Sequence, residues 1–221
     1  MAATGSALES NAQLDDVLAY LPISITTEYK KGQIIYSPDR PPTSIYMVVS
    51  GKVEVSQIGE NGKEVLMEII RPDELFGETA FIDAPRRCEQ ATAFEKARVM
   101  TWAISDIESL VMRRPRLAVG LLQVLVQRNI EFTRRIESFS TESIERRLAR
   151  ALLRFSERLG SPSDDGSSRM VPLTHSLLSR YVGTSREIIS HHMNHFRKKG
   201  YVNYSRQSIL IYPGAIKAFK N

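Results

Sequence analysis

The segment from Thr174 to Gly200, THSLLSRYVGTSREIISHHMNHFRKKG, constrains the fold of this chain more than any other. Thr174 is a suitable N-cap for a first helix, and Gly183 permits a sharp turn after it. Thr184 with Glu187 three residues later matches the capping box that opens a second helix. The second helix has a buried stripe, Ile189, Met193 and Phe196, and an opposite polar face, Glu187, His191, Asn194 and Lys198. This pattern predicts two short helices joined by a glycine turn, with one polar face that no core covers.

A short hairpin is predicted directly after these helices. The stretch YVNYSRQSILIY, residues 201–212, has two apolar runs around a polar SRQS turn. Such a hairpin forms a wing beside the second helix, with Arg206 at its tip. A helix pair of this kind places the first turn of its second helix in the DNA major groove, where the Arg186 guanidinium can bind guanine and the Glu187 carboxylate can accept from cytosine.

The distribution of charge agrees with a polyanionic partner for the C-terminal part. Residues 142–221 contain 14 lysines and arginines against 6 aspartates and glutamates, whereas residues 1–141 contain 16 against 19. The C-terminal part therefore carries a net charge of +8 on a mildly acidic body of −3. Each phosphate that a basic surface neutralises releases counterions, which favours nucleic-acid binding.

The region from about Tyr29 to Trp102 has short β-rich runs separated by turn residues. The runs are residues 34–36, 44–49, 52–58, 64–70 and 97–104, and Asn61-Gly62 is a hairpin turn between the third and the fourth. Strands at this spacing predict a β-barrel or roll. A roll encloses space in which a ligand can sit.

The stretch LFGETAFIDAPRRCEQATA, residues 75–93, interrupts this pattern with a glycine-led turn, a loop and a return strand. We expect Gly77, Glu78, Arg87 and Cys88 to approach one another there. Backbone amides facing an arginine can hold an anionic group, and a carboxylate can accept from a sugar hydroxyl. The alternative is a loop in which Arg87 forms an ordinary salt bridge.

Ser105 and Glu108 form a second predicted capping box, before a helix that ends near Pro115. A longer helix is predicted over residues 116–140. Its apolar stripe contains Leu121, Leu122, Leu125, Val126, Ile130 and Ile136, and its outer face contains Arg128, Glu131, Arg134, Arg135 and Glu137. A stripe of this length favours a seam with a second copy of the chain, and packing along its own roll is the alternative.

These patterns divide the chain into a flexible leader (1–17), a β-roll sensor (18–115), a central helix (116–140) and a C-terminal domain (141–221). The single cysteine, Cys88, excludes an internal disulfide and favours a reducing cytoplasm. A long apolar run and a signal pattern are both missing from the sequence, which argues against membrane insertion and export.

A β-roll with GE…RC, a long central helix and a TSRE helix with a wing resembles the cyclic-AMP receptor protein/FNR (CRP/FNR) family of bacterial transcription regulators. The resemblance covers nearly the whole chain from about Leu18. It implies an α+β fold, with a cyclic-nucleotide-binding-type β-roll (a double-stranded β-helix), a central dimerisation helix and a C-terminal winged helix-turn-helix. It also implies a homodimer that binds double-stranded DNA at an inverted repeat, with RNA polymerase as a further partner.

The resemblance assigns roles to individual residues of both regions. Arg186 and Glu187 match base-reading positions, His191 stands where the cyclic-AMP receptor proteins have a second base-reading arginine, and Thr174, His175, Ser185 and Arg206 are expected at the DNA backbone. Gly77, Glu78 and Arg87 match the ribose and phosphate site. Three positions differ from that site, because Cys88 replaces a serine, and Phe132 and Thr133 replace an adenine-contacting threonine and serine. Cyclic AMP is one candidate effector, and an apolar effector or none is the alternative that these differences favour.

All four histidines fall within the segment 174–200, and their protonation near pH 6 would add positive charge at the groove. His191 and His195 lack an evident third ligand for a metal, and a lone thiol such as Cys88 is more often a small apolar residue than a redox sensor. A constellation for catalysis is missing from the sequence, so we expect no enzyme. The competing hypothesis is a cyclic-nucleotide-binding module that regulates a protein partner.

Overall fold

The computed structural model describes residues 21–82, 88–205 and 207–220 of the chain. The predicted leader, Arg87 and Arg206 therefore lie outside the described residues. The chain forms two compact units, and the division between them falls within one long helix, between Thr133 and Arg134. Each unit is described by itself below.

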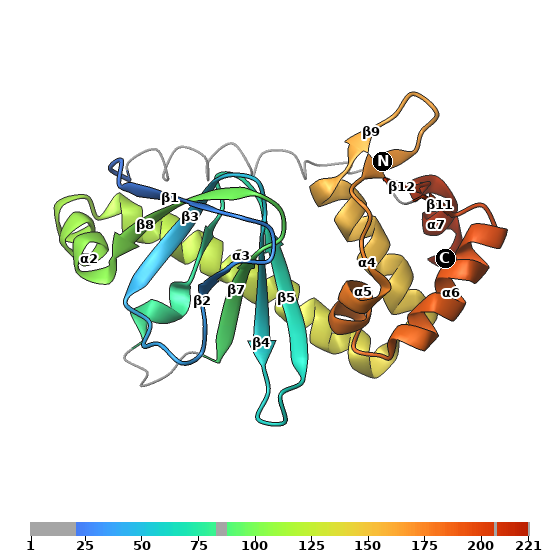
Figure 1. Ribbon diagram of the computed structural model, residues 1–221, viewed down its shortest axis with the longest axis horizontal. Helices are drawn as coiled ribbons and strands as arrows, with labels where there is room; N and C mark the ends of the chain where they lie inside the picture. The colour runs from blue at the N-terminus through green and yellow to red at the C-terminus, as the bar shows by residue number, and fades with distance from the viewer. Residues whose placement is uncertain (1–20, 83–87, 206, 221) are drawn as a thin grey trace, which may run out of the picture. The chain divides into compact units, whose positions relative to one another are not determined.

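The N-terminal unit is built on two four-stranded sheets (Figure 1). One has the order β1-β8-β3-β6 and the other β2-β7-β4-β5. The strands are β1 (Ile25–Tyr29), β2 (Ile34–Tyr36), β3 (Ser44–Ser50), β4 (Val53–Ile58), β5 (Glu64–Ile70), β6 (Leu75–Phe76), β7 (Glu89–Ala93) and β8 (Ala97–Ala103). All five β-rich runs of the sequence are strands, and β7 is the predicted return strand. Strand β1 was not predicted, because its ITTEY sequence has four exposed residues and no buried alternation.

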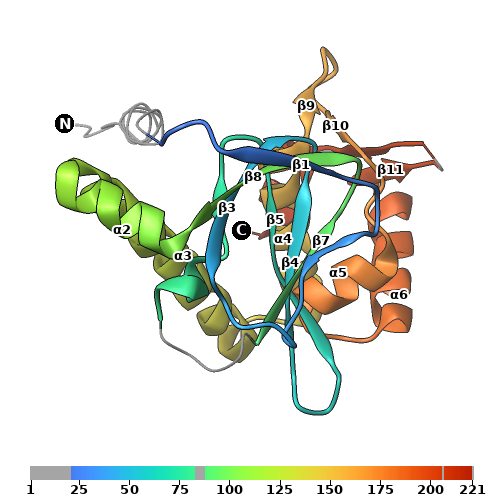
Figure 2. The ribbon, with the colours of Figure 1, turned by 60° about the vertical axis from the view of Figure 1, so that its left-hand side comes forward.

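Figure 2 shows the strands of the roll from a second side. Their buried residues form the core of the roll, because successive side chains of a strand face opposite sides of the sheet. One cluster joins both sheets through Val48, Val53, Ile70, Phe76 and Val99. A second cluster, Ile45, Leu75, Trp102 and Ile107, lies where helix α2 (Ile104–Arg113) meets β8. The predicted capping box at the start of α2 is wrong, because the N-cap is Ala103 and no side chain caps the helix.

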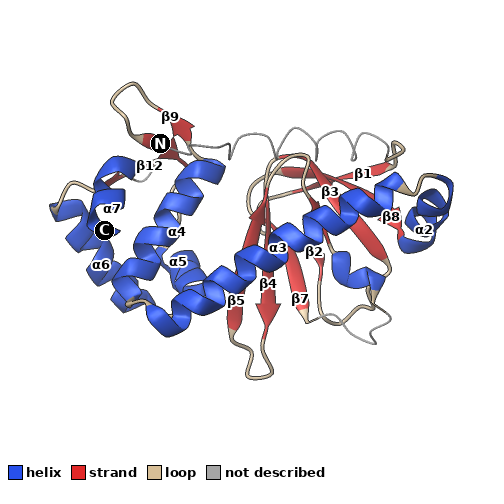
Figure 3. Ribbon diagram, turned by 180° about the vertical axis from the view of Figure 1, so that it is seen from behind, coloured by secondary structure: helices blue, strands red, loops and turns tan. Residues whose placement is uncertain are grey.

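Helix α3 (Arg116–Thr141) is one continuous helix, as Figure 3 shows. Leu117 is buried, and Leu121 packs against the second core cluster of the roll. The remaining residues of the predicted stripe are exposed: Leu122, Leu125, Val126, Ile130 and Ile136. One edge of the stripe therefore packs on the chain's own roll, while the described residues leave the wider part uncovered. Arg128, predicted on the outer face, is instead mostly buried in the N-terminal unit.

The C-terminal unit contains the helices α4 (Ile144–Leu159), α5 (His175–Val182), α6 (Arg186–Lys198) and α7 (Pro213–Lys220). Its sheet has the order β11-β12-β10-β9, with β9 (Ser161–Pro162), β10 (Ser168–Met170), β11 (Val202–Tyr204) and β12 (Ile209–Ile211). Helix α4 supplies the centre of the core with Leu148, Leu152 and Phe155, and Phe155 contacts the Tyr181 ring at 4.7 Å. Helices α5 and α6 and the β11–β12 wing were predicted from the sequence, whereas α4 and the β9–β10 hairpin were not.

The turn between α5 and α6 depends on Gly183. Its φ is +74°, in the left-handed region, and a Cβ there would lie 3.0 Å from the Phe139 ring. The predicted N-cap of α6 is one residue early, because Ser185 rather than Thr184 accepts the Ile188 N–H, at 3.3 Å. The predicted pairing of Thr184 with Glu187 as a capping box is therefore wrong, and Ser185 is both the cap and the residue beside Arg186.

Candidate nucleic-acid interface and effector cavity

The start of α6 presents a charged, exposed surface on a rigid base. The side of α6 that faces the core consists of buried residues, as predicted: Ile189, Met193 and Phe196. Arg186 and Glu187 occupy its exposed first turn, and His191 is exposed one turn further on. The pKa of Glu187 is lowered by its own backbone amide, by the Ser185 hydroxyl and by the charge of Arg186, although desolvation opposes the shift. An ionised carboxylate beside a guanidinium can accept from a base amino group while its neighbour donates.

Two helix caps and a histidine lie near this turn. The Thr174 hydroxyl accepts the Leu177 N–H at 3.1 Å, and each capping hydroxyl, Thr174 and Ser185, retains a proton that it can donate to a phosphate. His175 Nδ1 lies 2.8 Å from the Ser190 hydroxyl, which itself donates to the Arg186 carbonyl at 2.9 Å. His175 therefore donates its Nδ1 proton to the Ser190 hydroxyl. Its Nε2 becomes a second donor only when the ring is protonated.

The wing is tied to α6 through Tyr204 at the end of β11. The Tyr204 hydroxyl donates to Asn194 Oδ1 at 2.9 Å, and the Arg197 guanidinium lies 5.2 Å from the centre of the Tyr204 ring. His175 contacts the same ring edge-on at 6.1 Å. Sequence reasoning placed Asn194 on the polar face but missed this junction, because the contact joins residues ten positions apart on different elements.

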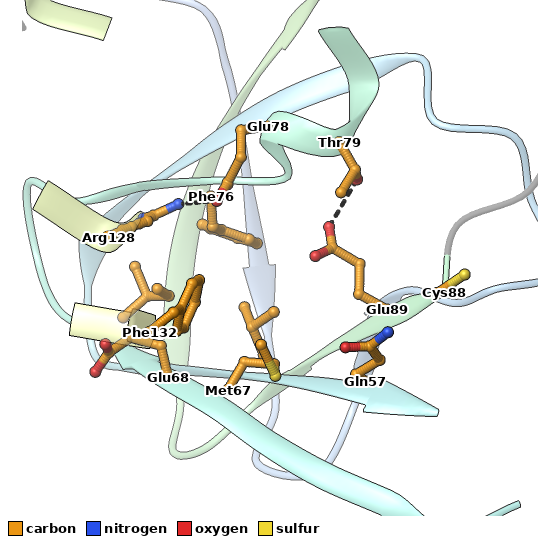
Figure 4. A pocket seen from close by; sticks show the side chains of 12 residues that line it. Gln57, Met67, Glu68, Phe76, Glu78, Thr79, Cys88, Glu89, Arg128 and Phe132 are labelled. Carbon is orange, nitrogen blue, oxygen red and sulfur yellow. Dashed lines mark hydrogen bonds and ion pairs between the residues drawn. The ribbon is translucent and has the colours of Figure 1, made fainter. Parts of the chain in front are cut away.

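The roll encloses a cavity of about 250 Å³ (Figure 4). Its walls are apolar at Val55, Met67, Ile70, Phe76 and Phe132 and polar at Gln57, Glu68, Glu78, Thr79, Cys88, Glu89 and Arg128. Among the described residues, three carboxylates therefore line the cavity against one guanidinium. Glu89 accepts from the Tyr36 hydroxyl at 2.8 Å and from the Thr79 hydroxyl at 2.9 Å.

An ion pair between Arg128 and Glu78 crosses one side of the cavity (Figure 4). The two side chains approach to 2.5 Å, and Arg128 also donates to the Leu75 carbonyl. Burial is the largest single influence and opposes the charge of Arg128, but the carboxylates of Glu78, Glu68 and Glu74 together outweigh it, so the pKa of Arg128 is raised. Arg128 was predicted on the outer face of the long helix and not in the ligand site. Its signal was its position one helical turn before Phe132, on the same face of α3.

The structure places the predicted ligand residues unequally around this cavity. Glu78, Cys88 and Phe132 line it, and Cys88 is exposed. Gly77 is buried beside it with φ +84°, and a Cβ there would lie 2.8 Å from the Tyr46 ring, so only glycine fits this turn. Thr133 is exposed on α3 and is not among the lining residues. Groups of three or more potential metal ligands are missing from the described residues.

Comparisons with known proteins agree with both halves of the structure. Residues 26–114 match the cyclic nucleotide-binding domain family, and residues 146–213 match the Crp-like helix-turn-helix domain family. A CRP-like cAMP-activated global transcriptional regulator of Mycobacterium tuberculosis is 26% identical over 83% of this chain and 82% of its own. The cyclic AMP receptor protein of Thermus thermophilus is 27% identical over 85% of this chain and 84% of its own.

Solved structures share this fold. A CRP/FNR-family transcriptional regulator from Thermus thermophilus has a TM-score of 0.72 and 27% identity, over 89% of this chain and 98% of its own. FixK2 from Bradyrhizobium japonicum has a TM-score of 0.78 over 90% of this chain and 98% of its own, at 18% identity.

A cyclic-nucleotide-binding-type roll joined to a winged helix-turn-helix defines a class of DNA-binding transcription regulators. The chain belongs to the CRP/FNR family of that class. The relatives are transcription regulators, which supports this reading and not a module that acts on a protein partner. Among the described residues, no helix combines the length and the apolar character needed to cross a membrane.

Proposed function

We propose that this protein is a homodimeric regulator that reads an inverted-repeat operator with two copies of α6. The observation that carries the proposal is the exposed first turn of α6, where Arg186 and Glu187 stand on a buried stripe that fixes the helix. Two such helices about 34 Å apart would enter successive major grooves on one face of the duplex. The protein acts by binding DNA and RNA polymerase in the cytoplasm, without catalysis of its own.

Each DNA contact follows from the chemistry of its side chain. Arg186 binds the O6 and N7 atoms of a guanine, Glu187 accepts from a cytosine, and His191 contacts a variable base. Thr174, His175, Ser185 and Arg206 contact the DNA backbone. The caps are suited to that task because their helix N-termini also direct free amides at a phosphate.

The domain division we propose follows from the same roles: a leader over 1–17, a sensor over 18–115, a dimerisation helix over 116–140 and a DNA-binding domain over 141–221. The exposed apolar residues of α3 supply the dimer seam, because such a stripe is stable in water only when another surface covers it.

We propose the cavity in the roll as the effector site, formed by Gly77, Glu78, Arg87, Cys88 and Phe132. Thr133, which does not line the cavity of its own chain, would contact the effector from the second subunit. The relatives from Mycobacterium tuberculosis and Thermus thermophilus are named for cyclic AMP. The family resemblance assigns Glu78 to the ribose and phosphate turn. Phe132 removes a hydroxyl that an adenine amino group would need, and the described lining carries more carboxylates than cations. Both features favour an effector less polar than cyclic AMP.

The operator itself is the test of the main proposal. Duplexes recovered by the purified protein from a fragmented genome or a random library should share one inverted repeat, with and without added cyclic nucleotide. Equal retention of every duplex at physiological ionic strength would contradict sequence-specific binding.

Arg186→Ala should weaken binding to the recovered operator by about 1 to 3 kcal/mol and binding to random DNA much less. The reason is that a bidentate guanine contact exists only at the matching base pair, whereas phosphate contacts exist everywhere. Fluorescence anisotropy on both duplexes measures the difference. Equal losses on both would show that Arg186 contacts only phosphate.

A further inference from the structure

Asn194 lies on the same exposed face of α6 as the base-reading residues. It follows His191 by three residues and Glu187 by seven, and these spacings stack side chains along one face of a helix. Asn194 is exposed, and its neighbours at the core, Met193 and Phe196, are fully buried. The side chain is therefore presented outward from a fixed backbone.

The carboxamide of Asn194 is held in one orientation although it is exposed. The Tyr204 hydroxyl donates to Asn194 Oδ1 at 2.9 Å. The Tyr204 ring is itself positioned by the Arg197 guanidinium, 5.2 Å from its centre, and by the edge of His175 at 6.1 Å. An exposed asparagine ordinarily samples several rotamers, so a hydrogen bond to a tyrosine that two further contacts hold in place reduces that freedom before any ligand arrives.

We propose that Asn194 reads an adenine in the operator and that Tyr204 positions it for that contact. A carboxamide oxygen has two lone pairs, of which Tyr204 uses one. The second lone pair and the Nδ2 hydrogens form an acceptor-donor pair that matches the N6 amino group and the N7 atom of adenine. This inference rests on the proposed function, because it requires α6 to lie in the major groove.

The fixed plane of the carboxamide distinguishes this target from a phosphate. A phosphate offers only acceptors and is satisfied by Nδ2 in many orientations, so holding the oxygen would bring no advantage there. The last turn of α6 carries Arg197 and Lys198 and is followed by Lys199 at the C-cap, so cations suited to phosphates are already present there. A preset plane strengthens binding only to a partner that makes two hydrogen bonds at once, as an adenine edge does.

The test replaces single adenines of the recovered operator by 7-deazaadenine, in both half-sites at once. This base keeps its Watson–Crick pairing and lacks the N7 acceptor. For the full-length protein, one adenine position should show a loss of about tenfold in affinity on this replacement. The Asn194→Ala protein should bind the duplex modified at that position as tightly as it binds the unmodified duplex. At the other adenine positions, replacement should change its affinity as it changes that of the wild type. Tyr204→Phe, which retains the ring and its contacts, should reduce the penalty at that position to about threefold.

Asn203→Ala is the matched control, because Asn203 is an exposed asparagine on the same wing strand. It should keep the wild-type response at every adenine, and equal thermal unfolding of all variants would show that the fold is retained. The proposal is overturned if the wild type and Asn194→Ala respond alike to every replacement, or if Asn194→Ala weakens all duplexes equally, as a phosphate contact would. Failure to recover any operator would instead overturn the proposed function.

Discussion

At the scale of single residues, titration and DNA binding meet at the histidines of the C-terminal unit. The pKa of His175 is lowered by burial and by the charge of Arg186. The pKa of His192 is lowered by burial and by His191 and His195, against an opposing effect of Glu145. The ordinary pKa of histidine is about 6.5, and both rings have a lower pKa than that. Both are therefore mostly neutral in the free protein at pH 7. Nearby DNA phosphates would favour their protonated forms.

Operator affinity should therefore rise as the pH falls from 8 to 6, with most of the gain below the ordinary histidine pKa. Each proton taken up on binding changes the affinity by at most tenfold per pH unit. Anisotropy titrations over this range should show a smaller rise for His175→Gln, and a still smaller one when all four histidines are glutamine. Equal pH dependence of all three proteins would reject the idea.

The free protein should show the opposite trend in stability. The unfolded chain takes up protons at these histidines at a higher pH than the folded chain does, because their pKa values are lowered in the folded state. The free energy of unfolding therefore falls as the pH drops through about 6.5. Denaturant titration at pH 7.5 and 5.5 without DNA separates this effect from binding, and His175→Gln should reduce it.

At the scale of elements, α3 has two edges with different partners. Leu117 and Leu121 pack on the roll, while Leu122 and Val126 are 59% and 58% exposed. The sequence pattern shows only one apolar stripe, because hydropathy does not reveal which of its residues the chain's own core covers. The exposed edge is the part that a second copy would bury.

Leu122→Glu combined with Val126→Glu should dissociate the homodimer, because the seam would bury paired like charges. Sedimentation equilibrium should show a monomer, and operator affinity should fall by about 100-fold or more as the two half-sites lose their linked binding. Gln123→Glu adds a charge on the same helix and should leave the dimer intact. A stable dimer of the double variant would place the seam elsewhere.

At the scale of the whole molecule, an effector can control DNA binding only if it favours one state of the dimer over another. Such a coupling is reciprocal, so operator DNA must change effector affinity by the same factor. Phe132 lines the cavity that we propose as the effector site, at a position that the family resemblance assigns to an adenine contact. In that proposal the side chain at position 132 selects the ligand that exerts the coupling.

Phe132→Thr should bind cyclic AMP about tenfold more tightly than the wild type, because a threonine hydroxyl restores one buried hydrogen bond to the adenine amino group. Calorimetric titration with cyclic AMP and cyclic GMP measures this gain. Phe132→Leu, which enlarges the cavity without a hydroxyl, is the control and should show little gain. Tight binding of cyclic AMP by the wild type would contradict an effector of lower polarity.

Much of the fold was predictable because its signals are local. The period of apolar residues identifies five strands, α3, α5 and α6, and the positive φ of Gly77 and Gly183 explains why glycine occupies both turns. The family resemblance likewise depends on contiguous motifs. Local rules failed at the starts of α2 and α6, where Ala103 and Ser185 are the caps, since the geometry of the preceding turn decides which residue faces the free amides.

The sequence by itself determined the order of elements, the basic C-terminal part and the polar face of α6, because each follows from residue type and spacing along the chain. Only the tertiary structure decided that Arg128 turns inward to Glu78 and that Tyr204 holds Asn194. These contacts join side chains from separate elements. The distance between the paired side chains depends on how the packed core positions those elements. Spacing along the chain does not determine it.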